Sequence, residues 1–411
     1  MKIVVFTLGC KVNECESDSL ITGLKGMGHA VSDKLEYADL YIVNTCAITA
    51  DAEKKSRQMS SRVARLNPNA KIIFTGCATQ KDPDSFLKKT NCSLVTGVFQ
   101  KDKILSMLAN NGLCIADATT VYEELPFANT LKDRAYVKVQ DGCNNFCSYC
   151  IVPYLRGRSR SRNIDSVANE VKNATTDELV VNGINLSDYN SDGKTLADLI
   201  RAISFTDKRI RLGSLEVRVI TEDFLSALKG LKNFAPHFHL SLQSGSDNVL
   251  KKMNRHYTSS EYLDKVNLIR EYFPNAGITT DIIAGFPTET EQDFLDTLEF
   301  AKKVNFSDIH PFIFSPRQGT VAYKMQDLSH EVKKARLDKL LIVKEELKNQ
   351  FALANVDKTL TVLFEEEKDG YFEGYTENYL RAYLKSNEKP KGLQKVKVLS
   401  PYKDGVSVEL I

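Results

Sequence analysis

Apolar runs alternate with helical spacing through the first 128 residues. Three runs that each end in polar residues and a cysteine are typical of buried strands, and they cover residues 2–8, 40–43 and 71–74. Helical spacing lies between them, near residues 17–27 and 49–66. Strands that alternate with helices form parallel sheets through right-handed crossovers. The pattern therefore predicts an N-terminal α/β domain with a parallel sheet at residues 1–128.

The same alternation continues on a larger scale from residue 132 to residue 355. Six strand-like segments occur here, at residues 135–139, 179–181, 210–212, 237–242, 278–283 and 309–314. Helical patterns separate them, around residues 164–174, 195–203, 221–228, 259–273 and 289–304. Six β/α units predict a (β/α)6 partial TIM barrel, in which active-site groups gather at the carboxyl ends of the strands.

The pattern changes again after a charged helical stretch at residues 331–353. Short alternating segments follow, at residues 360–364, 371–375, 380–383, 395–399 and 406–410. Five short strands in so few residues predict a small antiparallel β-barrel at residues 356–411. Tyrosines, an arginine and a lysine are interleaved in it, and such side chains either bind RNA by stacking and charge or form a core with a solvated rim.

Composition narrows the class of protein. The chain has 411 residues, enough for two to four domains, and its net charge of +2 argues against a protein coated in nucleic acid. No stretch approaches the roughly 20 apolar residues of a membrane span, and the N-terminus lacks the features of a signal peptide. Nine cysteines in such a chain indicate metal or redox chemistry in a reducing compartment. We therefore expect a cytoplasmic protein that does not associate with membranes.

Cys143, Cys147 and Cys150 form a C-x3-C-x2-C run with an aromatic residue, Tyr149, before the last cysteine. Three thiolates from one loop would hold three irons of a cubane cluster and leave the fourth iron without a protein ligand. The alternatives are a zinc knuckle and a CxxC redox pair, but the second ligand pair usual in zinc sites does not follow. The run resembles the signature of the radical SAM superfamily. That resemblance implies a 4Fe–4S cluster whose open iron binds S-adenosylmethionine.

Three further cysteines share one topological position in the N-terminal domain. Cys10, Cys46 and Cys77 each follow a predicted strand, so a parallel sheet would bring them to the same edge. The pattern leaves open whether they form a second three-thiolate site or are ordinary buried cysteines. Cys15 and the remaining two cysteines, Cys92 and Cys114, are interpreted as structural.

Four short motifs together make the resemblance more specific. They are TLGCKVN at residues 7–13, NTC at 44–46, TGC at 75–77 and the CxxxCxxC run. These motifs resemble those of the methylthiotransferase family, and the likeness extends over the whole chain. It implies two 4Fe–4S clusters, with Cys10, Cys46 and Cys77 holding the second cluster, which presents sulfur to the substrate.

Polar residues and glycines after the barrel strands are candidates for the cofactor site. The candidates are Gly183, Asn185, Ser214, Glu216, Gln243 and Gly285, beside Tyr149. The glycines would allow close approach to a nucleoside or methionine moiety, and the polar groups would bind its ammonium, carboxylate or ribose hydroxyls. Each also has a purely structural alternative, such as a simple turn at Gly285.

Arginines form the candidate substrate site. Arg156, Arg158, Arg160 and Arg162 occupy every second position, so an extended segment would place all four on one face, suited to phosphate or carboxylate. The alternative is a solvated charge run. Arg317, after the sixth barrel strand, is a further candidate.

The resemblance implies radical transfer of a methylthio group to C2 of an adenosine next to the anticodon, at position 37 of tRNA, and no acid or base catalyst is assigned. The TLGCKVN start is similar to the branch that acts on N6-threonylcarbamoyladenosine. The alternative substrates are N6-isopentenyladenosine and an aspartate of a ribosomal protein, and the alternative of another class is an iron–sulfur RNA-binding protein without turnover.

The C-terminal segment resembles the TRAM domain of tRNA methylthiotransferases. We expect tRNA and an electron donor such as flavodoxin or ferredoxin as partners of a monomer.

Overall fold

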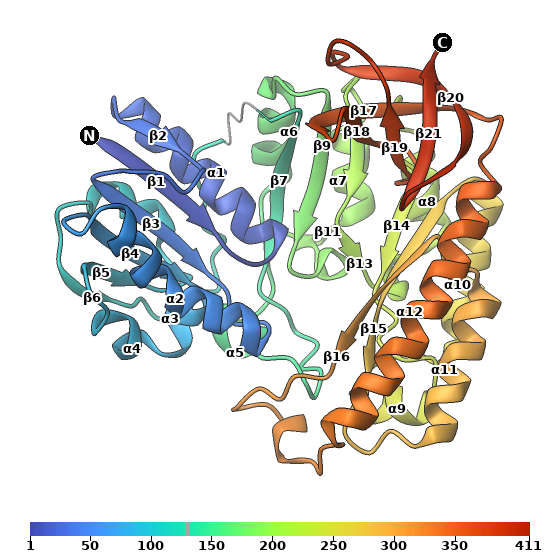
Figure 1. Ribbon diagram of the computed structural model, residues 1–411, viewed down its shortest axis with the longest axis horizontal. Helices are drawn as coiled ribbons and strands as arrows, with labels where there is room; N and C mark the ends of the chain where they lie inside the picture. The colour runs from blue at the N-terminus through green and yellow to red at the C-terminus, as the bar shows by residue number, and fades with distance from the viewer. Residues whose placement is uncertain (128–131) are drawn as a thin grey trace.

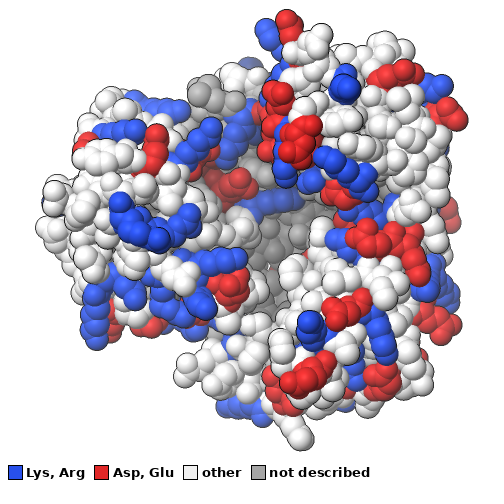
Figure 2. All heavy atoms as spheres, in the orientation of Figure 1, with Lys and Arg blue, Asp and Glu red and all other residues white. Residues whose placement is uncertain are grey.

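The computed structural model describes residues 1–127 and 132–411, which form three folding units (Figure 1). A space-filling view shows a hollow between the N-terminal unit and the rest of the molecule (Figure 2). The predicted boundary between the first two domains falls on residues 128–131, which lie outside the described residues. Among the described helices, none is both long and apolar enough to cross a membrane.

The N-terminal unit is a six-stranded sheet in the order β2-β1-β3-β4-β5-β6, and all of its strand pairs are parallel. Its strands are β1 (Lys2–Thr7), β2 (Ala30–Ser32), β3 (Leu40–Thr45), β4 (Lys71–Gly76), β5 (Cys92–Thr96) and β6 (Gly112–Cys114). The predicted parallel sheet is confirmed. Three further strands, β2, β5 and β6, were not predicted, and two of them, β2 and β6, have only three residues each.

Helices cover both faces of this sheet. Ile3, Ile42 and Ile73 point to one face, where they pack against the helix α1 (Lys11–Gly26) and the 3-10 helix η1 (Lys101–Ser106). Val43 and Phe74 point to the other face. The helices of that face are α2 (Ala50–Leu66), α3 (Cys77–Lys81) and α4 (Pro83–Leu87). Burial on both faces explains why these strands read as continuous apolar runs rather than alternating ones.

The central unit is a partial barrel of parallel strands. Its strands are β7 (Arg134–Asp141), β9 (Glu178–Gly183), β12 (Arg209–Leu212), β13 (Ser214–Leu215), β14 (His237–Leu240), β15 (Gly277–Ala284) and β16 (Asp308–Ile313). They run in the orders β7-β9-β12 and β13-β14-β15-β16, and β8 (Arg160–Ser161) adds an antiparallel edge to β7. The main outer helices are α6 (Ile164–Asn173), α7 (Leu196–Ala202), α8 (Glu222–Lys229), α10 (Ser259–Tyr272) and α11 (Glu291–Val304). The predicted partial barrel is confirmed.

Alternation along the barrel strands separates an apolar outside from a polar inside. Ile210 and Leu212 belong to the core under the outer helices. Arg209 and Arg211, at the intervening positions of β12, reach instead to Glu178 on β9. Because the barrel is open, its inner face is lined by polar side chains rather than filled by apolar layers. This inner face forms one wall of the hollow.

A long helix, α12 (His330–Leu353), leads to the C-terminal unit. There β17 (Thr359–Lys368), β18 (Tyr371–Thr376), β19 (Arg381–Leu384), β20 (Leu393–Tyr402) and β21 (Gly405–Leu410) close into a barrel in the order β17-β18-β19-β21-β20. Val362, Phe364, Ala382 and Val396 form its core. The predicted five-stranded barrel is confirmed.

The small barrel docks on the amino ends of the central strands. Glu178 is fully buried there and pairs with Arg209 and Arg211. These two arginines also donate to backbone carbonyls of the small barrel, those of Thr361, Tyr375, Thr376 and Glu377. A Cβ at Gly277 would lie 2.0 Å from the carbonyl oxygen of Asn378, so the close contact of the two units requires glycine there.

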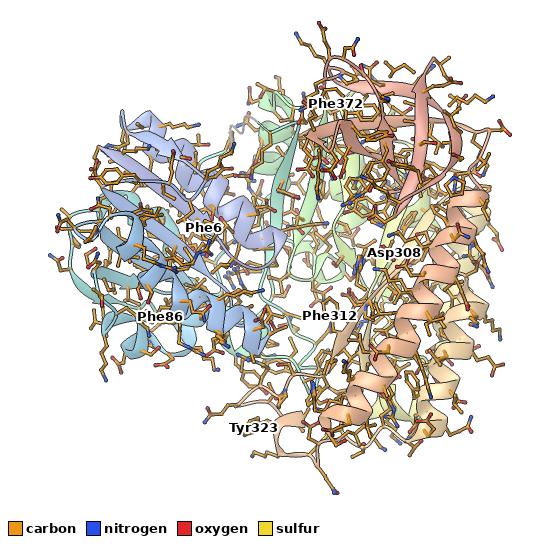
Figure 3. The ribbon with its side chains drawn as sticks, in the orientation of Figure 1. Phe6, Phe86, Asp308, Phe312, Tyr323 and Phe372 are labelled. Carbon is orange, nitrogen blue, oxygen red and sulfur yellow. The ribbon has the colours of Figure 1, made fainter. Side chains whose placement is uncertain are left out.

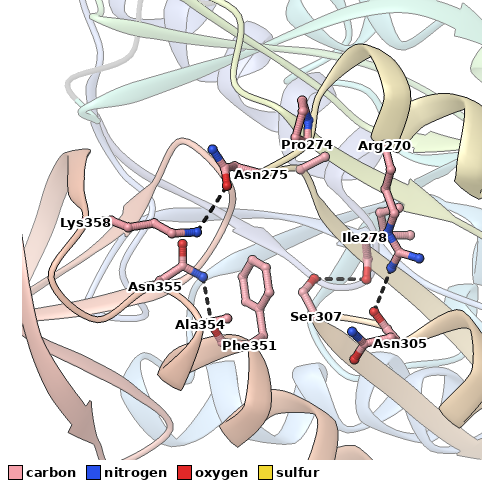
Figure 4. Close-up of a pocket in the computed structure, with 11 residues that line it drawn as sticks. Arg270, Pro274, Asn275, Ile278, Asn305, Ser307, Phe351, Ala354, Asn355 and Lys358 are labelled. Atoms are coloured by element: carbon pink, nitrogen blue, oxygen red, sulfur yellow. Dashed lines mark hydrogen bonds between the residues drawn. The ribbon is translucent and has the colours of Figure 1, made fainter.

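A pocket of about 150 Å³ lies at this junction (Figure 4). Its polar groups bond to one another: Lys358 Nζ donates to Asn275 Oδ1 at 3.1 Å, and Ser307 Oγ donates to the Ile278 carbonyl at 2.9 Å. We therefore treat this pocket as part of the joint between the two units.

Candidate functional site

Two adjoining cavities lie at the carboxyl ends and on the inner face of the central strands. The smaller, of about 200 Å³, is lined by the three cysteines of the CxxxCxxC loop. The larger, of about 620 Å³, is lined by Cys10 and by residues of the inner barrel face. Four residues line both cavities, namely Val152, Ile184, Ser214 and Ser241. A group bound in the smaller cavity would therefore face the larger one directly.

The cysteine loop connects β7 to the short helix α5 (Val152–Arg156). Three N–H groups point at its sulfur atoms. Cys143 Sγ accepts from the Asn145 amide at 3.5 Å and from Asn185 Nδ2 at 3.8 Å. Arg255 Nη1 lies 3.4 Å from Cys147 Sγ. Such hydrogen bonds to sulfur stabilise the thiolate form that iron–sulfur clusters need.

The N-terminal cysteines also meet. Cys10 precedes α1, Cys46 follows β3, and Cys77 opens α3. Gly9, at a φ of +103°, leaves no room for a Cβ, which would lie 2.8 Å from Cys46 Sγ. Burial first, and then the neighbouring thiols of Cys77 and Cys10, raise the pKa of Cys46 to about 12. The structure thus places Cys46 near Cys10 and Cys77, and a cluster held by the three thiolates stays a prediction.

Neither set of cysteines forms an evident single-ion site in the described part of the chain. Among the described residues, no three histidine, cysteine or acidic side chains are arranged to hold one metal ion. A single zinc ion draws its thiolates to about 2.3 Å, whereas each cysteine of a cubane binds a different iron. Burial also raises the pKa of Cys143 to about 11 and of Cys150 to about 12, so bound metal would be needed to ionise these thiols.

A buried network of charges stands beside Cys77. Arg156 Nε lies 3.4 Å from Cys77 Sγ, and Arg156 Nη1 lies 2.9 Å from Glu16 Oε1 and 3.0 Å from Asp141 Oδ1. The other cations of the network are Lys101, Lys138 and Arg160.

Burial alone would raise the pKa of Glu16, but the charges of Arg156, Lys101 and Lys138 hold that pKa well below its usual value. Burial would likewise raise the pKa of Asp141, and its cationic neighbours hold that pKa low. Four cations against two carboxylates leave an excess of positive charge next to the N-terminal cysteines. A cluster held by three thiolates carries net negative charge, so this surrounding fits it.

The arginine run does not form one extended face. Arg156 ends α5, and Gly157 follows at a φ of +72°, so the chain turns between Arg156 and Arg158. Arg156, Arg160 and Arg162 are buried in ion pairs with carboxylates of this chain, and so is Arg317 with Glu53.

Arg158 is the exposed member of the run, and its guanidinium carbon lies 4.4 Å from the centroid of the Phe146 ring. Substrate contact by these arginines stays a prediction.

Most of the predicted cofactor residues share the smaller cavity. Tyr149, Asn185, Ser214, Glu216 and Gln243 all line it. The two predicted glycines, Gly183 and Gly285, do not line this cavity.

Of these two, Gly183 lines the larger cavity, with Gln140 filling the space of its missing Cβ. Gly285 lines neither cavity, and a Cβ there would meet Lys333 of α12.

Two residues of the smaller cavity have unusual surroundings. The Glu216 carboxylate binds Arg255 at 2.9 Å and Arg218 at 2.8 Å, so it already has two cationic partners. Gln243 has a φ of +72°, and beyond the end of β14 its backbone still pairs with β15, through bonds to Asp281 and Ile283. Left-handed backbone at a side chain other than glycine is a strain that concentrates at functional sites.

The larger cavity contains residues that the strand-end argument missed. His239 contacts Thr279 Oγ1 at 2.9 Å and Asp281 Oδ2 at 3.2 Å. Phe312 keeps 49% of its surface exposed and faces the hollow (Figure 3). The signal for these residues was present in alternate positions of β14, β15 and β16, since side chains two residues apart face the same side.

One wall of this cavity comes from the C-terminal unit. Tyr379 lines the cavity at a φ of +71°, with its ring stacked on His237 at 4.1 Å between centroids. Tyr375 also stacks on the Tyr379 ring, with 4.6 Å between the two ring centroids.

Comparison with known families matches residues 137–301 to the Radical SAM superfamily and residues 2–97 to the uncharacterized protein family UPF0004. The chain is 35% identical to the threonylcarbamoyladenosine tRNA methylthiotransferase MtaB of Bacillus subtilis, covering 100% of this chain and 97% of that protein. The enzyme of the same name from Thermotoga maritima is 39% identical over 85% of this chain and 82% of its own. A tRNA-2-methylthio-N(6)-dimethylallyladenosine synthase of Alkaliphilus oremlandii is 34% identical over 89% of this chain and 82% of its own.

Solved structures support the fold. The radical S-adenosylmethionine methyltransferase TsrM from Kitasatospora setae, with cobalamin and a 4Fe–4S cluster bound, aligns with a TM-score of 0.56. The alignment covers 76% of this chain and 74% of TsrM at 12% identity. At that identity the likeness concerns the fold alone.

Proposed function

Because this chain belongs to the radical SAM tRNA methylthiotransferases, we propose that it transfers a methylthio group to C2 of N6-threonylcarbamoyladenosine next to the anticodon, at position 37 of tRNA. The observation that carries this proposal is that the three loop cysteines line the smaller cavity, while Cys10 lines the larger cavity that adjoins it. The relatives named for the threonylcarbamoyl substrate support the choice of base.

The two cysteine sites take separate tasks. Cys143, Cys147 and Cys150 would hold the cluster that binds S-adenosylmethionine, and Cys10, Cys46 and Cys77 would hold a second 4Fe–4S cluster. When bound, the first cluster supplies an electron for the reductive cleavage of S-adenosylmethionine, and the second supplies sulfur to the substrate.

The residues of the smaller cavity bind and orient S-adenosylmethionine. Asn185, Ser214 and Gln243 present polar groups to its amino acid and ribose parts, and Tyr149 closes one side by packing edge-on against Phe286 at 6.4 Å between centroids. Glu216 is held in place by Arg255 and Arg218, so its carboxylate oxygens have a fixed direction.

The larger cavity receives the base. Phe312 offers an exposed aromatic ring of the kind on which unstacked bases stack, and Tyr379 lines the same cavity. Enclosure by three folding units limits access of water, which protects a radical from side reactions.

The three domains divide the work on tRNA. Residues 1–128 present sulfur, residues 132–355 generate the radical, and residues 356–411 form a TRAM-like unit that contacts tRNA. Lys and Arg side chains also gather over the face of α2 (Figure 2). Lys54, Lys55, Arg62 and Arg65 are exposed there and are suited to phosphate contacts. The enzyme acts as a monomer with an electron donor such as flavodoxin or ferredoxin.

Substrate preference tests this function. Enzyme reconstituted with iron and sulfide without oxygen is incubated with S-adenosylmethionine, reductant and tRNA that carries threonylcarbamoyladenosine, isopentenyladenosine or unmodified adenosine. Mass spectrometry of the digested nucleosides should find the 2-methylthio product with the first tRNA. Product from the isopentenyl tRNA alone would assign the chain to the other substrate branch.

A further inference from the structure

Lys11 places an ammonium group in the larger cavity, directly after the cluster ligand Cys10. Its side chain is exposed and lines the cavity. Among the described residues it forms no ion pair or hydrogen bond through its ammonium, and its neighbour is the Tyr379 ring, whose centroid lies 5.9 Å from Nζ. A cation without a carboxylate partner is thus available to a ligand in the cavity.

The other charges near this cavity are already matched. Of the described residues that line it, Lys11 is the single lysine or arginine, and Asp281 is the single aspartate or glutamate. Asp281 is bonded to His239. Arg211, whose guanidinium carbon lies 5.1 Å from the centroid of the Tyr379 ring, is bound to Glu178 and to two backbone carbonyls.

The nearby arginines cannot supply this charge without breaking buried pairs. Arg156 and Arg160 are held by Glu16 and Asp141, and Arg162 by Glu170. Removing one partner of a buried ion pair leaves an uncompensated charge and is strongly unfavourable. An anionic ligand in the cavity would therefore meet Lys11 first.

We propose that Lys11 is the specificity-determining residue that binds the free carboxylate of the N6-threonylcarbamoyl group. This inference rests on the proposed function. On adenine, N6 and C2 flank N1 on the same edge, so a substituent on N6 and the sulfur acceptor C2 point to the same side of the base. A base that presents C2 to sulfur near Cys10 would therefore also present its N6 substituent toward Lys11, the next residue.

Tyr379 fixes the place of the ammonium. Its ring is held between His237 and Tyr375 by stacking at 4.1 Å and 4.6 Å, and its left-handed backbone aims it into the cavity. Lys11 lies beside this fixed ring, which limits the directions the lysine can take. An ammonium in such a place makes a charge-assisted hydrogen bond to a carboxylate with little further ordering.

Binding without turnover gives the direct test. Lys11→Gln, Lys11→Arg and the control Lys25→Gln, at an exposed lysine in the last turn of the same helix, are compared in complex with S-adenosylmethionine and without reductant. The probes are anticodon stem-loops with threonylcarbamoyladenosine, isopentenyladenosine or adenosine. Lys11→Gln should weaken binding of the first probe by about ten- to a hundredfold and leave the other two unchanged. Lys11→Arg should recover part of the loss, and Lys25→Gln should bind all three probes like the parent.

A chemical variant of the probe tests the same contact with the unaltered enzyme. A stem-loop whose threonyl carboxylate is converted to its amide should bind the parent as weakly as the acid binds Lys11→Gln, and the two changes should not add. Full additivity, equal losses on all three stem-loops, or undiminished binding by Lys11→Gln would each overturn the assignment. A parent that methylthiolates only isopentenyladenosine would instead overturn the proposed function, so the two failures are distinguishable.

Discussion

Arg255 joins the first cysteine site to the wall of the cofactor cavity. Its guanidinium reaches Cys147 Sγ at 3.4 Å, Glu216 Oε1 at 2.9 Å and the Ser241 carbonyl at 3.0 Å. A planar fork with several donors suits such a three-way contact, and a lysine would not reproduce it. Arg255 therefore acts as a positioning residue for both the cluster ligand and the cofactor cavity.

Replacing Arg255 tests this role. We expect Arg255→Gln to slow reductive cleavage of S-adenosylmethionine by roughly 10–100-fold, the usual cost of losing a partner that orients a metal ligand. The reduction potential of the cluster should also fall, because a hydrogen bond to a thiolate sulfur is lost. Release of 5′-deoxyadenosine and a redox titration measure the two effects.

Arg218→Gln is the matched control, since Arg218 also binds Glu216 but does not contact a cysteine sulfur in the described structure. It should leave the potential unchanged. If Arg255→Gln and Arg218→Gln behave alike, the contact with Cys147 has no role of its own.

At the residue scale, the sequence predicted the candidate cluster ligands better than the side chains that contact them. The spacing of the cysteines was enough to place Cys143, Cys147 and Cys150 in one loop. The partners of their sulfur atoms come from elements far along the chain, such as Arg255 after α9 (Asp247–Lys252), and spacing holds no information about such contacts.

The short helix α5 connects the cysteine loop to the N-terminal sheet. Leu155 packs into the core of the N-terminal unit, and Arg156 enters its charge network. Although α5 lies within the central unit, it thus packs against and forms ion pairs with residues of the N-terminal unit. This docking fixes the distance between the two cysteine sites.

The charge network predicts that replacing Arg156 destabilises the protein much more than replacing Arg158, two residues further along the chain. Arg156→Met would remove charge-assisted hydrogen bonds to Glu16 and Asp141, each of which keeps other cationic partners, and we expect a loss of about 1.5–3 kcal/mol of stability. Arg158→Met, at the exposed neighbour, should change stability by less than about 0.5 kcal/mol. Chemical denaturation of both variants, followed by circular dichroism without oxygen, measures the difference. Similar midpoints for both would show that the buried network does not hold the units together.

At the element scale, periodicity predicted most helices and strands, but not the conformation of the arginine run. Its alternating arginines suggested an extended strand with one charged face. The structure instead ends α5 at Arg156 and pairs Arg156 with Glu16, which is 140 residues away in the sequence. Partners at such a sequence distance decide between an extended surface and a buried network, and a local pattern does not contain them.

The three units together line one cavity, the chamber of the proposed reaction. The N-terminal unit brings Cys10 and Lys11, the central barrel brings His239 and Phe312, and the C-terminal barrel brings Tyr379. The three units and their order along the chain were predicted from the sequence, because each unit has its own pattern of apolar positions. The chamber between them was not predicted, since it depends on how the units dock, and docking relies on buried pairs between units such as Arg156 with Glu16.

The central claim is that two cysteine sites perform separate tasks on one chamber. The most direct measurement compares two triple variants, one with Cys10, Cys46 and Cys77 changed to Ala and one with Cys143, Cys147 and Cys150 changed to Ala. Iron content, 5′-deoxyadenosine and the methylthio nucleoside are measured in the same anaerobic reaction on threonylcarbamoyladenosine tRNA.

We expect about eight irons in the parent, the content of two cubane clusters, and about half of that in each triple variant. The variant without the N-terminal cysteines should still form 5′-deoxyadenosine but no methylthio nucleoside, and the variant without the loop cysteines should form neither. Methylthio product from the first variant, or a parent with about four irons, would contradict the account.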